Sequence, residues 1–395
     1  MDLATKPPKK DRELPAKGRE VYGFRPLGAR EFNDLSRKSQ RHSNRKRDQP
    51  FNRPLQLPLQ QFAPRQMLKQ MSLLSLETIK QRVLPDLQAV DSVIRARLTT
   101  DVVLVNQVAE YIIQSGGKRI RPLVTVLAGR ACGATGSQLA ATAAIVEFVH
   151  TATLLHDDVV DGSDLRRGHE TANAVWGNQT SVLVGDYLYS RAFEMMVDLN
   201  IMRIMDVMAS ATNKIAEGEV LQLMNANDPD TTEERYLEVI YRKTAKLFEA
   251  GTQIAAIIAN ANAEYENALK QYGKCLGTAF QLVDDVLDYR ANREELGKNL
   301  GDDLAEGKPT LPLIHALKHG NPTQQKLIRS AIENGGIESL SEITTAIEST
   351  GGLEYTAQRA RQEANLAIQA LTELPNSDFV QALRELAEFA VNRGY

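Results

Sequence analysis

From residue 71 onward, apolar positions recur with the period of an amphipathic helix. Segments such as LAATAAIVEFVHTATLLHDD (residues 139–158) and FQLVDDVLDY (residues 280–289) carry Ala, Leu, Ile, Val and Phe at helical spacing. Strand-like alternation between turn residues is hard to find, and proline is absent between Pro122 and Pro229 and again up to Pro309. The pattern therefore predicts an all-α protein whose many helices are joined by short loops that contain Gly or Asn.

The first 70 residues follow no apolar period. Residues 1–65 hold 16 Lys and Arg against 7 Asp and Glu, together with eight of the 15 prolines. We predict that residues 1–70 form a basic, proline-rich, disordered extension and that residues 71–395 form one compact catalytic domain. The basic run RHSNRKR could bind an anionic surface or act as an address. A solvated tail is the simpler interpretation, and Met67 or Met71 could be the true start.

Composition excludes several classes of protein. The chain has 395 residues, 47 Lys and Arg against 50 Asp and Glu, and 43% hydrophobic residues, which are ordinary values for a globular protein. The near-neutral charge gives no case for a nucleic-acid partner. No apolar stretch reaches the roughly 18 residues of a membrane-spanning helix, so we expect no integral membrane segment. The two cysteines, Cys132 and Cys275, cannot build a disulfide scaffold or a zinc cluster, which fits a reducing cytoplasm.

Two short strings each place three aspartates in the pattern DDxxD at the end of an apolar helical run. These residues are Asp157, Asp158, Asp161, Asp284, Asp285 and Asp288. Residues i and i+4 share a helix face, so the first and third aspartates of each string project together. Like charges at this spacing destabilise a helix, and at its C-terminal end they oppose its dipole. We predict that both strings bind Mg²⁺, which proteins hold through one or two carboxylates plus substrate phosphates. A solvated acidic helix end is the alternative for either string.

Basic residues near both strings could bind an anion. They are Lys118 and Arg121 in GGKRIRP, Arg166 and Arg167 in DLRRG, Lys243 in YRKTAKLF, and Lys298 and Lys308 in GKNLGDDLAEGKPT. Each alone is weak support, because Lys and Arg are usually solvated, and the Gly-Gly-Lys string lacks the context of a Walker A loop. Because these basic residues lie near two predicted Mg²⁺-binding aspartate strings, they predict that the substrate is a diphosphate ester.

These motifs, taken together, resemble those of the trans-isoprenyl diphosphate synthases. GGKRIRP, LLHDDVVDGSDLRRG, GDYLYSRAF, KTAKLF, FQLVDDVLDY and GKNLGDDLAEGKPT occur in the order of that family, and the resemblance covers residues 71–395. Longer strings such as IAEGEVLQLMNANDPD are similar to its bacterial octaprenyl diphosphate synthases. The resemblance implies the isoprenoid synthase fold, a bundle of long antiparallel helices around a deep central cavity, and a homodimer.

The resemblance also implies the reaction. A cytoplasmic, Mg²⁺-dependent prenyltransferase would condense isopentenyl diphosphate repeatedly onto an allylic diphosphate. Farnesyl diphosphate would be extended to octaprenyl diphosphate, which supplies the side chain of a respiratory quinone. The preferred allylic primer and the product length to within one or two isoprene units stay open.

Roles for individual residues follow from the same resemblance. Two or three Mg²⁺ ions would be held by Asp157, Asp158, Asp161, Asp284, Asp285 and Asp288. Isopentenyl diphosphate would bind Lys118, Arg121, His150 and Arg167. The allylic diphosphate would contact Arg166, Lys243, Thr244 and Gln281, with Lys298 and Lys308 in a loop that closes over it. The catalytic set would be Asp157, Asp158, Asp161, Lys243, Thr244, Gln281, Asp284 and Asp285.

Two further residues have weaker assignments. Asp302 would lie near a metal-bound water. His150 could be misread as a general base or could be a core histidine, but we expect it to donate a hydrogen bond to isopentenyl diphosphate. The released diphosphate, rather than a side chain, would accept the proton.

Product length should depend on the residues that precede the first aspartate string. Ala152 and Thr153 come about one helical turn before Asp157, and a turn rises about 5.4 Å, roughly one isoprene unit. In short-chain relatives an aromatic residue near these positions forms a floor, so its absence predicts a long tunnel. We expect the floor lower down, at Met196 of the Met195/Met196 pair, although the pair could equally be plain core.

Three other functions are weighed against this one. A non-catalytic subunit that assists a partner synthase would be expected to lose one aspartate string, and both are intact. A class I terpene cyclase would share the fold, but its second metal motif usually mixes Asn, Ser and Glu. A phosphohydrolase could use the same carboxylates but would not need an apolar tunnel.

Overall fold

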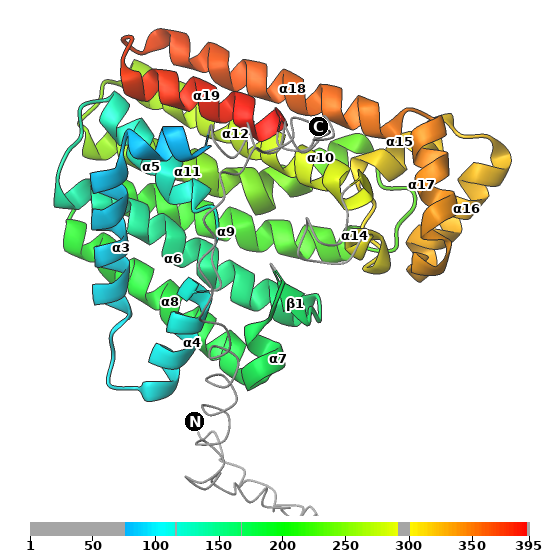
Figure 1. Cartoon of the computed structure of the whole chain (residues 1–395), viewed down its shortest axis with the longest axis horizontal. Coiled ribbons are helices and arrows are strands. Elements are labelled where there is room, and N and C mark those ends of the chain that lie inside the picture. Colours follow the sequence, from blue (N-terminus) through cyan, green and yellow to red (C-terminus); the bar gives the residue numbers. More distant parts are fainter. Residues whose placement is uncertain (1–75, 115–116, 167, 291–300, 393–395) are drawn as a thin grey trace, which may run out of the picture. The chain divides into compact units, whose positions relative to one another are not determined.

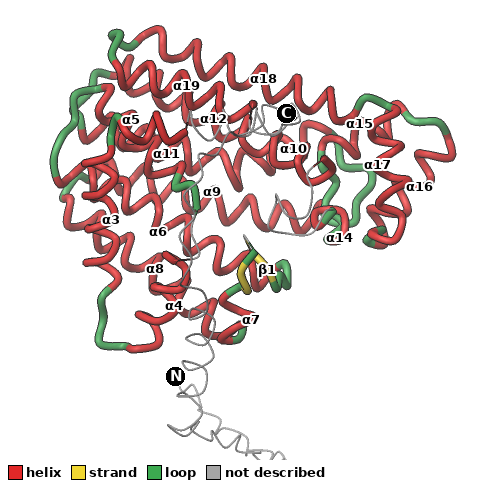
Figure 2. Tube along the Cα trace, viewed as in Figure 1, coloured by secondary structure: helices red, strands yellow, loops and turns green. Residues whose placement is uncertain are grey.

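The computed structural model of the chain describes residues 76–114, 117–166, 168–290 and 301–392. The predicted extension 1–70 lies outside them, so its disorder and the domain boundary at residue 70 stay predictions. Helices make up nearly all of the regular structure in the described part of the chain (Figures 1 and 2). The predicted all-α class is therefore confirmed.

The first half of the described chain contains α3 (Leu84–Leu98), α4 (Val103–Gln114), α5 (Ile120–Ala131), α6 (Ser137–Val160), α7 (Ala172–Trp176), α8 (Asn178–Leu199) and α9 (Met202–Asn225). A short antiparallel pair, β1 (Leu165–Arg166) and β2 (His169–Glu170), follows α6. The second half contains α10 (Glu233–Ile240), a π-helical segment (Tyr241–Ala245), α11 (Lys246–Ile258), α12 (Ala263–Arg290), α14 (Asp302–Ala305), α15 (Leu311–His319), α16 (Pro322–Asn334), α17 (Leu340–Ser349), α18 (Gly352–Ala370) and α19 (Asp378–Asn392). Single 3₁₀ turns precede α17 and follow α18.

Helix α6 is apolar along most of its 24 residues and is packed inside the protein. It begins after Gly136, whose φ of 85° glycine adopts readily, and it ends at Asp161. By length and composition α6 could cross a membrane, which the sequence analysis did not anticipate. However, 61% of its most apolar window is buried against the rest of the protein, as is typical of a core helix. Helix α6 thus anchors the first aspartate string to the core.

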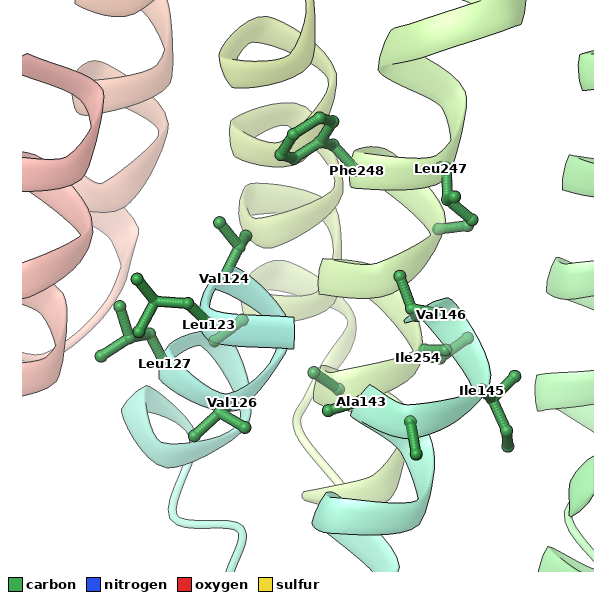
Figure 3. Close-up of a cluster of buried hydrophobic side chains, with 14 of the residues drawn as sticks. Leu123, Val124, Val126, Leu127, Ala143, Ile145, Val146, Leu247, Phe248 and Ile254 are labelled. Atoms are coloured by element: carbon green, nitrogen blue, oxygen red, sulfur yellow. The ribbon is translucent and has the colours of Figure 1, made fainter. Parts of the chain in front are cut away.

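The main hydrophobic cluster includes α5, α6 and α11 (Figure 3). Leu123 and Leu127 of α5, Val146 of α6 and Ile254 of α11 are fully buried there. Burying each such side chain contributes about 1.5–3 kcal/mol. Helix α11 also packs on α12, and α12 packs on α18 and α19, which lie side by side in Figure 1. This packing determines the positions of the C-terminal turns of α6 and α12.

Glycines let α12 approach its neighbours closely. A Cβ atom at Gly273 would lie 2.3 Å from Thr252 Oγ1 and 2.5 Å from the backbone oxygen of Phe248. A Cβ atom at Gly277 would lie 2.6 Å from Ala245 Cα, in the π-helical segment. Because real Cβ atoms do not approach so closely, both positions require glycine. The close approach places the π-helical segment directly against the C-terminal half of α12.

We expect Gly273→Ala to lower the free energy of unfolding by about 1–3 kcal/mol, because the added methyl group would overpack the contact with α11. Asn267→Ala, at an exposed position of the same helix, is the matched control. Urea unfolding followed by circular dichroism measures both variants. Equal midpoints for Gly273→Ala and the parent protein would contradict the packing argument.

Candidate active site

The first aspartate string lies in the last turn of α6. Asp158 is buried, with 4% of its surface exposed, and Arg166 of β1 pairs with it. Arg166 Nε donates a hydrogen bond of 2.7 Å to Asp158 Oδ1, and Arg166 Nη2 lies 2.6 Å from the same atom. The Asn173 amide donates to the Asp158 backbone oxygen at 3.2 Å. The short β pair and α7 therefore fix the middle aspartate, while Asp157 and Asp161 keep partly exposed carboxylates.

The second string lies near the end of α12 and differs in burial from one aspartate to the next. Asp284 is exposed, whereas Asp285 and Asp288 are buried. Gln281 Nε2 donates a hydrogen bond of 2.9 Å to Asp285 Oδ1, and the Tyr236 hydroxyl donates to Asp285 Oδ2. Asp285 is thus held by one donor on each oxygen, and Asp284 is the aspartate of this string that solvent reaches.

A later part of the chain contacts the second string at Asp288, which is buried although it shares a helix face with the exposed Asp284. Gly301 donates its backbone N–H to the Asp288 backbone oxygen at 3.3 Å. Because Gly301 directly precedes α14, this contact places the start of α14 next to the last turn of α12. Burial, followed by the negative charge of Asp303, raises the pKa of the Asp285 carboxyl well above its usual value. An additional carboxylate therefore joins the second string.

The π-helical segment lies between the two strings. Lys243 Nζ is 2.6 Å from Glu219 Oε2 of α9 and 3.8 Å from Asp157 Oδ2. The next residue, Thr244, donates its hydroxyl to Gln281 Oε1 at 2.8 Å. Since the Gln281 amide binds Asp285, the π-helical segment reaches the first string through Lys243 and the second through Thr244 and Gln281. π-Helical turns occur often at functional sites, and this one turns two consecutive side chains toward opposite strings.

The turn after the second string supplies another connection. Lys308 Nζ lies 3.3 Å from Asp161 Oδ2 and also pairs with Glu306. Burial lowers the pKa of the Lys308 ammonium, but Asp303, Asp161 and Glu306 outweigh it and raise that pKa overall. Asp303, which follows the predicted Asp302, is the residue whose charge acts on both the second string and Lys308. Segments about 150 residues apart in sequence therefore meet at one site.

Lys308 is positioned by the glycine before it. Gly307 has a φ of 67°, and its backbone oxygen accepts the Asn227 N–H at 2.9 Å. A Cβ atom at this position would lie 2.1 Å from Asn227 Oδ1. Glycine is therefore needed both for the backbone conformation and for the close contact with the loop after α9.

The basic residues of GGKRIRP form a separate group at the start of α5. Arg121 Nη1 lies 3.0 Å from His150 Nε2, and the Arg121 guanidinium lies 4.6 Å from the centre of the Phe248 ring. Lys118 Nζ is 5.8 Å from the centre of the Phe389 ring. His150 precedes Asp157 by two turns of α6, so it shares a helix face with that aspartate at an axial separation of about 10 Å. Arg167 and Lys298, also predicted to bind substrate, lie outside the described residues.

The charges of the site suit a divalent cation. Burial raises the pKa of the Asp157 carboxyl, while Lys243, Arg166 and Lys308 lower it and Asp161 raises it. The carboxylates outnumber the ammonium and guanidinium groups, and oxygen ligands of this kind suit a hard ion such as Mg²⁺. Among the described residues, no three Asp, Glu, His or Cys side chains are arranged to hold a metal ion by themselves. A metal held here would need oxygens from a bound phosphate as well.

The residues predicted to set product length lie in the core. Ala152 and Met196 are buried, and Thr153 donates its hydroxyl to the His150 backbone oxygen at 2.9 Å. A cavity of about 50 Å³ lies between α3, α4, α6 and α8, and none of these three residues lines it. The long tunnel and its floor therefore stay predictions.

Comparison with known proteins identifies the family. A profile of the polyprenyl synthetase family matches residues 102–349. The chain is 54% identical over 329 residues to the octaprenyl diphosphate synthase of Haemophilus influenzae. The aligned region covers 83% of this chain and 100% of that protein. The chain belongs to the polyprenyl synthetase family. The Escherichia coli octaprenyl diphosphate synthase is 55% identical to this polyprenyl synthetase over 321 residues, or 81% of this chain and 99% of that protein.

A solved structure agrees with this assignment. A polyprenyl synthase from Caulobacter crescentus, in complex with calcium and isoprenyl diphosphate, matches with 44% identity and a TM-score of 0.79. The match covers 81% of this chain and 98% of that one. The predicted isoprenoid synthase fold and the prediction of a prenyltransferase are therefore confirmed.

Sequence reasoning missed three side chains that act on the predicted residues. Glu219 binds Lys243, Tyr236 binds Asp285, and the charge of Asp303 acts on Asp285 and Lys308. Glu219 lies in the string GEVLQL, and Asp303 is the second aspartate of GDDLAEGK. Neither string indicates which side chain its acidic residue contacts in the folded protein.

We expect Gly307→Ala to reduce turnover at least tenfold, since the new methyl group would displace Lys308 from Asp161. Steady-state kinetics with isopentenyl diphosphate and an allylic diphosphate measures the loss. Gly351→Ala is the control, because Gly351 also has a positive φ, 75°, but a Cβ atom there meets nothing within 4 Å. Equal losses in the two variants would mean that backbone strain, and not the position of Lys308, matters.

Proposed function

We propose that this polyprenyl synthetase extends an allylic diphosphate by repeated addition of isopentenyl diphosphate. The proposed primer is farnesyl diphosphate and the proposed product is octaprenyl diphosphate, the precursor of a respiratory-quinone side chain. The identity to octaprenyl diphosphate synthases supports the product class. The observation that carries the proposal is that one π-helical segment reaches both aspartate strings, through Lys243 at Asp157 and through Thr244, whose partner Gln281 binds Asp285.

The cations of this site are suited to stabilise a leaving diphosphate. In the proposed reaction the allylic C–O bond breaks first, and negative charge develops on the diphosphate. Lys243, Lys308 and Arg166 would donate hydrogen bonds to its oxygens, because all three already bind carboxylates at the same place. Mg²⁺ held by Asp157, Asp161 and Asp284 would add Lewis-acid stabilisation when bound.

Neutral dipoles are suited to stabilise the carbocation without reacting with it. The Thr244 hydroxyl and the Gln281 amide lie next to each other, and neither is a strong nucleophile. Partial burial of Lys243, Lys308 and Asp157 limits access of water that would capture the cation. The double bond of isopentenyl diphosphate, held by Lys118, Arg121 and His150, would then attack C1. A proton leaves to the released diphosphate.

One incubation tests this function against the alternatives. The protein is mixed with Mg²⁺, farnesyl diphosphate and labelled isopentenyl diphosphate, and the dephosphorylated products are sized by chromatography. A labelled C40 alcohol supports the proposal. Cyclic hydrocarbons would indicate a terpene cyclase. Unlabelled farnesol that is already present before the dephosphorylation step would indicate a phosphohydrolase, and the absence of any product would indicate a subunit that needs a partner.

Exposed apolar side chains support the proposed homodimer. Leu183 and Val197 lie about four turns apart on one face of α8, with 66% and 64% of their surfaces exposed. On α9, Met202 and Val220 share a face and are 72% and 57% exposed. We propose that a second copy covers these faces. A cytoplasmic location is also proposed, and it agrees with the free thiols of the two cysteines.

We expect Asp157→Ala to reduce turnover by at least 10³-fold, because the variant loses the aspartate next to Lys243 in the first string. Asp206→Ala, at an exposed position of α9, is the matched control and should keep normal activity. Steady-state assays with saturating Mg²⁺ measure both. Near-normal turnover of Asp157→Ala would refute the proposed metal site.

We expect Ala152→Tyr to shorten the product, because a bulky side chain one turn before Asp157 would close the proposed tunnel. The buried position makes a fold defect an alternative cause, so circular dichroism accompanies the chromatographic sizing of the products. Ala152→Ser keeps the volume small and should leave the product length unchanged. A folded Ala152→Tyr enzyme with products of normal length would remove Ala152 from the proposed determinants.

A further inference from the structure

Helix α9 meets the π-helical segment at a glycine between two glutamates. A Cβ atom at Gly218 would lie 2.8 Å from Arg242 Cβ and 2.8 Å from the Lys243 backbone nitrogen. The two backbones can approach this closely only because position 218 has no side chain. The flanking glutamates, Glu217 and Glu219, are therefore brought against the first residues of the segment.

Each glutamate binds one cation of the π-helical segment, but on different sides of α9. Glu217 pairs with Arg242, which also pairs with Glu238 near the surface. Glu219 pairs with Lys243, and their side chains are 28% and 20% exposed. The first pair lies away from the aspartate strings. The second pair lies beside the first string, since Lys243 also contacts Asp157.

Glu219 and Asp157 compete for one ammonium group. Lys243 Nζ lies 2.6 Å from Glu219 Oε2, a hydrogen-bonded distance, but 3.8 Å from Asp157 Oδ2. The flexible lysine stem could close this second gap if the nearer partner were removed. Burial raises the pKa of the Glu219 carboxyl, Lys243 lowers it, and the neighbouring charges of Asp157 and Asp161 raise it again.

We propose that Glu219 is a positioning residue that holds the Lys243 ammonium away from Asp157, so that the Asp157 carboxylate stays available to a divalent cation. The inference rests on the proposed role of Asp157 in metal binding. Glu219 itself need not touch metal or substrate. Its effect passes through Lys243.

The inference is tested by titrating the free protein with Mn²⁺ and an unreactive thiolo analogue of farnesyl diphosphate added together, so that no diphosphate holds Lys243 in the starting state. Electron paramagnetic resonance monitors Mn²⁺ binding. Glu219→Gln should raise the dissociation constant of Mn²⁺ about tenfold, because Lys243 would then pair with Asp157. Glu219→Asp, which keeps the charge, should recover part of the loss. Glu217→Gln is the matched control and should change the constant less than twofold.

A double-mutant cycle separates this mechanism from a direct effect of the Glu219 charge on the metal. In a Lys243→Gln background, Glu219→Gln should cause no further change in the Mn²⁺ dissociation constant. The inference is overturned if Glu219→Gln weakens Mn²⁺ binding equally in both backgrounds, or if the folded single variant binds Mn²⁺ normally. Helical circular dichroism confirms that each variant is folded.

The same titration shows whether the underlying proposal fails instead. Asp157→Asn should weaken Mn²⁺ binding more than any Glu219 variant does. Normal Mn²⁺ binding by Asp157→Asn would refute the proposed metal role of Asp157. A strong loss in Asp157→Asn with no loss in Glu219→Gln would refute the positioning role alone.

Discussion

The site depends on the compensation of negative charge that two distant segments bring together. At an effective dielectric constant of about 20, two like charges 4 Å apart repel by about 4 kcal/mol. The ends of α6 and α12 would therefore be pushed apart if their carboxylates stood alone. Lys243 and Lys308 oppose this repulsion, and each comes from a segment outside the two aspartate strings. The site is thus assembled from four parts of the chain, and the two lysines offset the repulsion between its carboxylates.

Close contact between backbones at glycine residues makes this assembly possible. Gly277 lets α12 lie against the π-helical segment, and Gly218 lets α9 reach it from another side. Gly307 lets the loop after α14 meet the loop after α9. At each of these three glycines, a Cβ atom would push apart two backbone segments that carry interacting charged or polar side chains. Apolar packing of α5, α6 and α11 provides the rigid support, while these glycines determine how closely the charged groups approach.

The sequence was sufficient for the fold class and for the chemistry of the aspartate strings, because helical period and charge repulsion are local properties. It was not sufficient for burial within a string. Asp284 and Asp288 share a face by spacing, yet Asp284 is exposed and Asp288 is buried, a difference that depends on tertiary packing and not on the helical period. Likewise, Tyr236 and Glu219 carry no motif of their own, and their importance follows from tertiary contacts with Asp285 and Lys243. Asp303 acts on Asp285 and Lys308, whereas the sequence pointed to its neighbour Asp302, because composition does not show which partners two adjacent aspartates meet. The role of Asp302 stays a prediction.

The ion pairs of this site also suggest why substrate and metal should bind together. Lys243 and Lys308 interact here with Glu219, Asp161 and Glu306, and in the proposed function diphosphate oxygens would replace these carboxylates as their partners. When a diphosphate recruits these lysines, the carboxylates lose their counter-charge in a partly buried site, which is costly. A divalent cation that binds both the freed aspartates and the diphosphate removes this cost. Each ligand thereby favours the other, and the reciprocity follows from the exchange of partners alone.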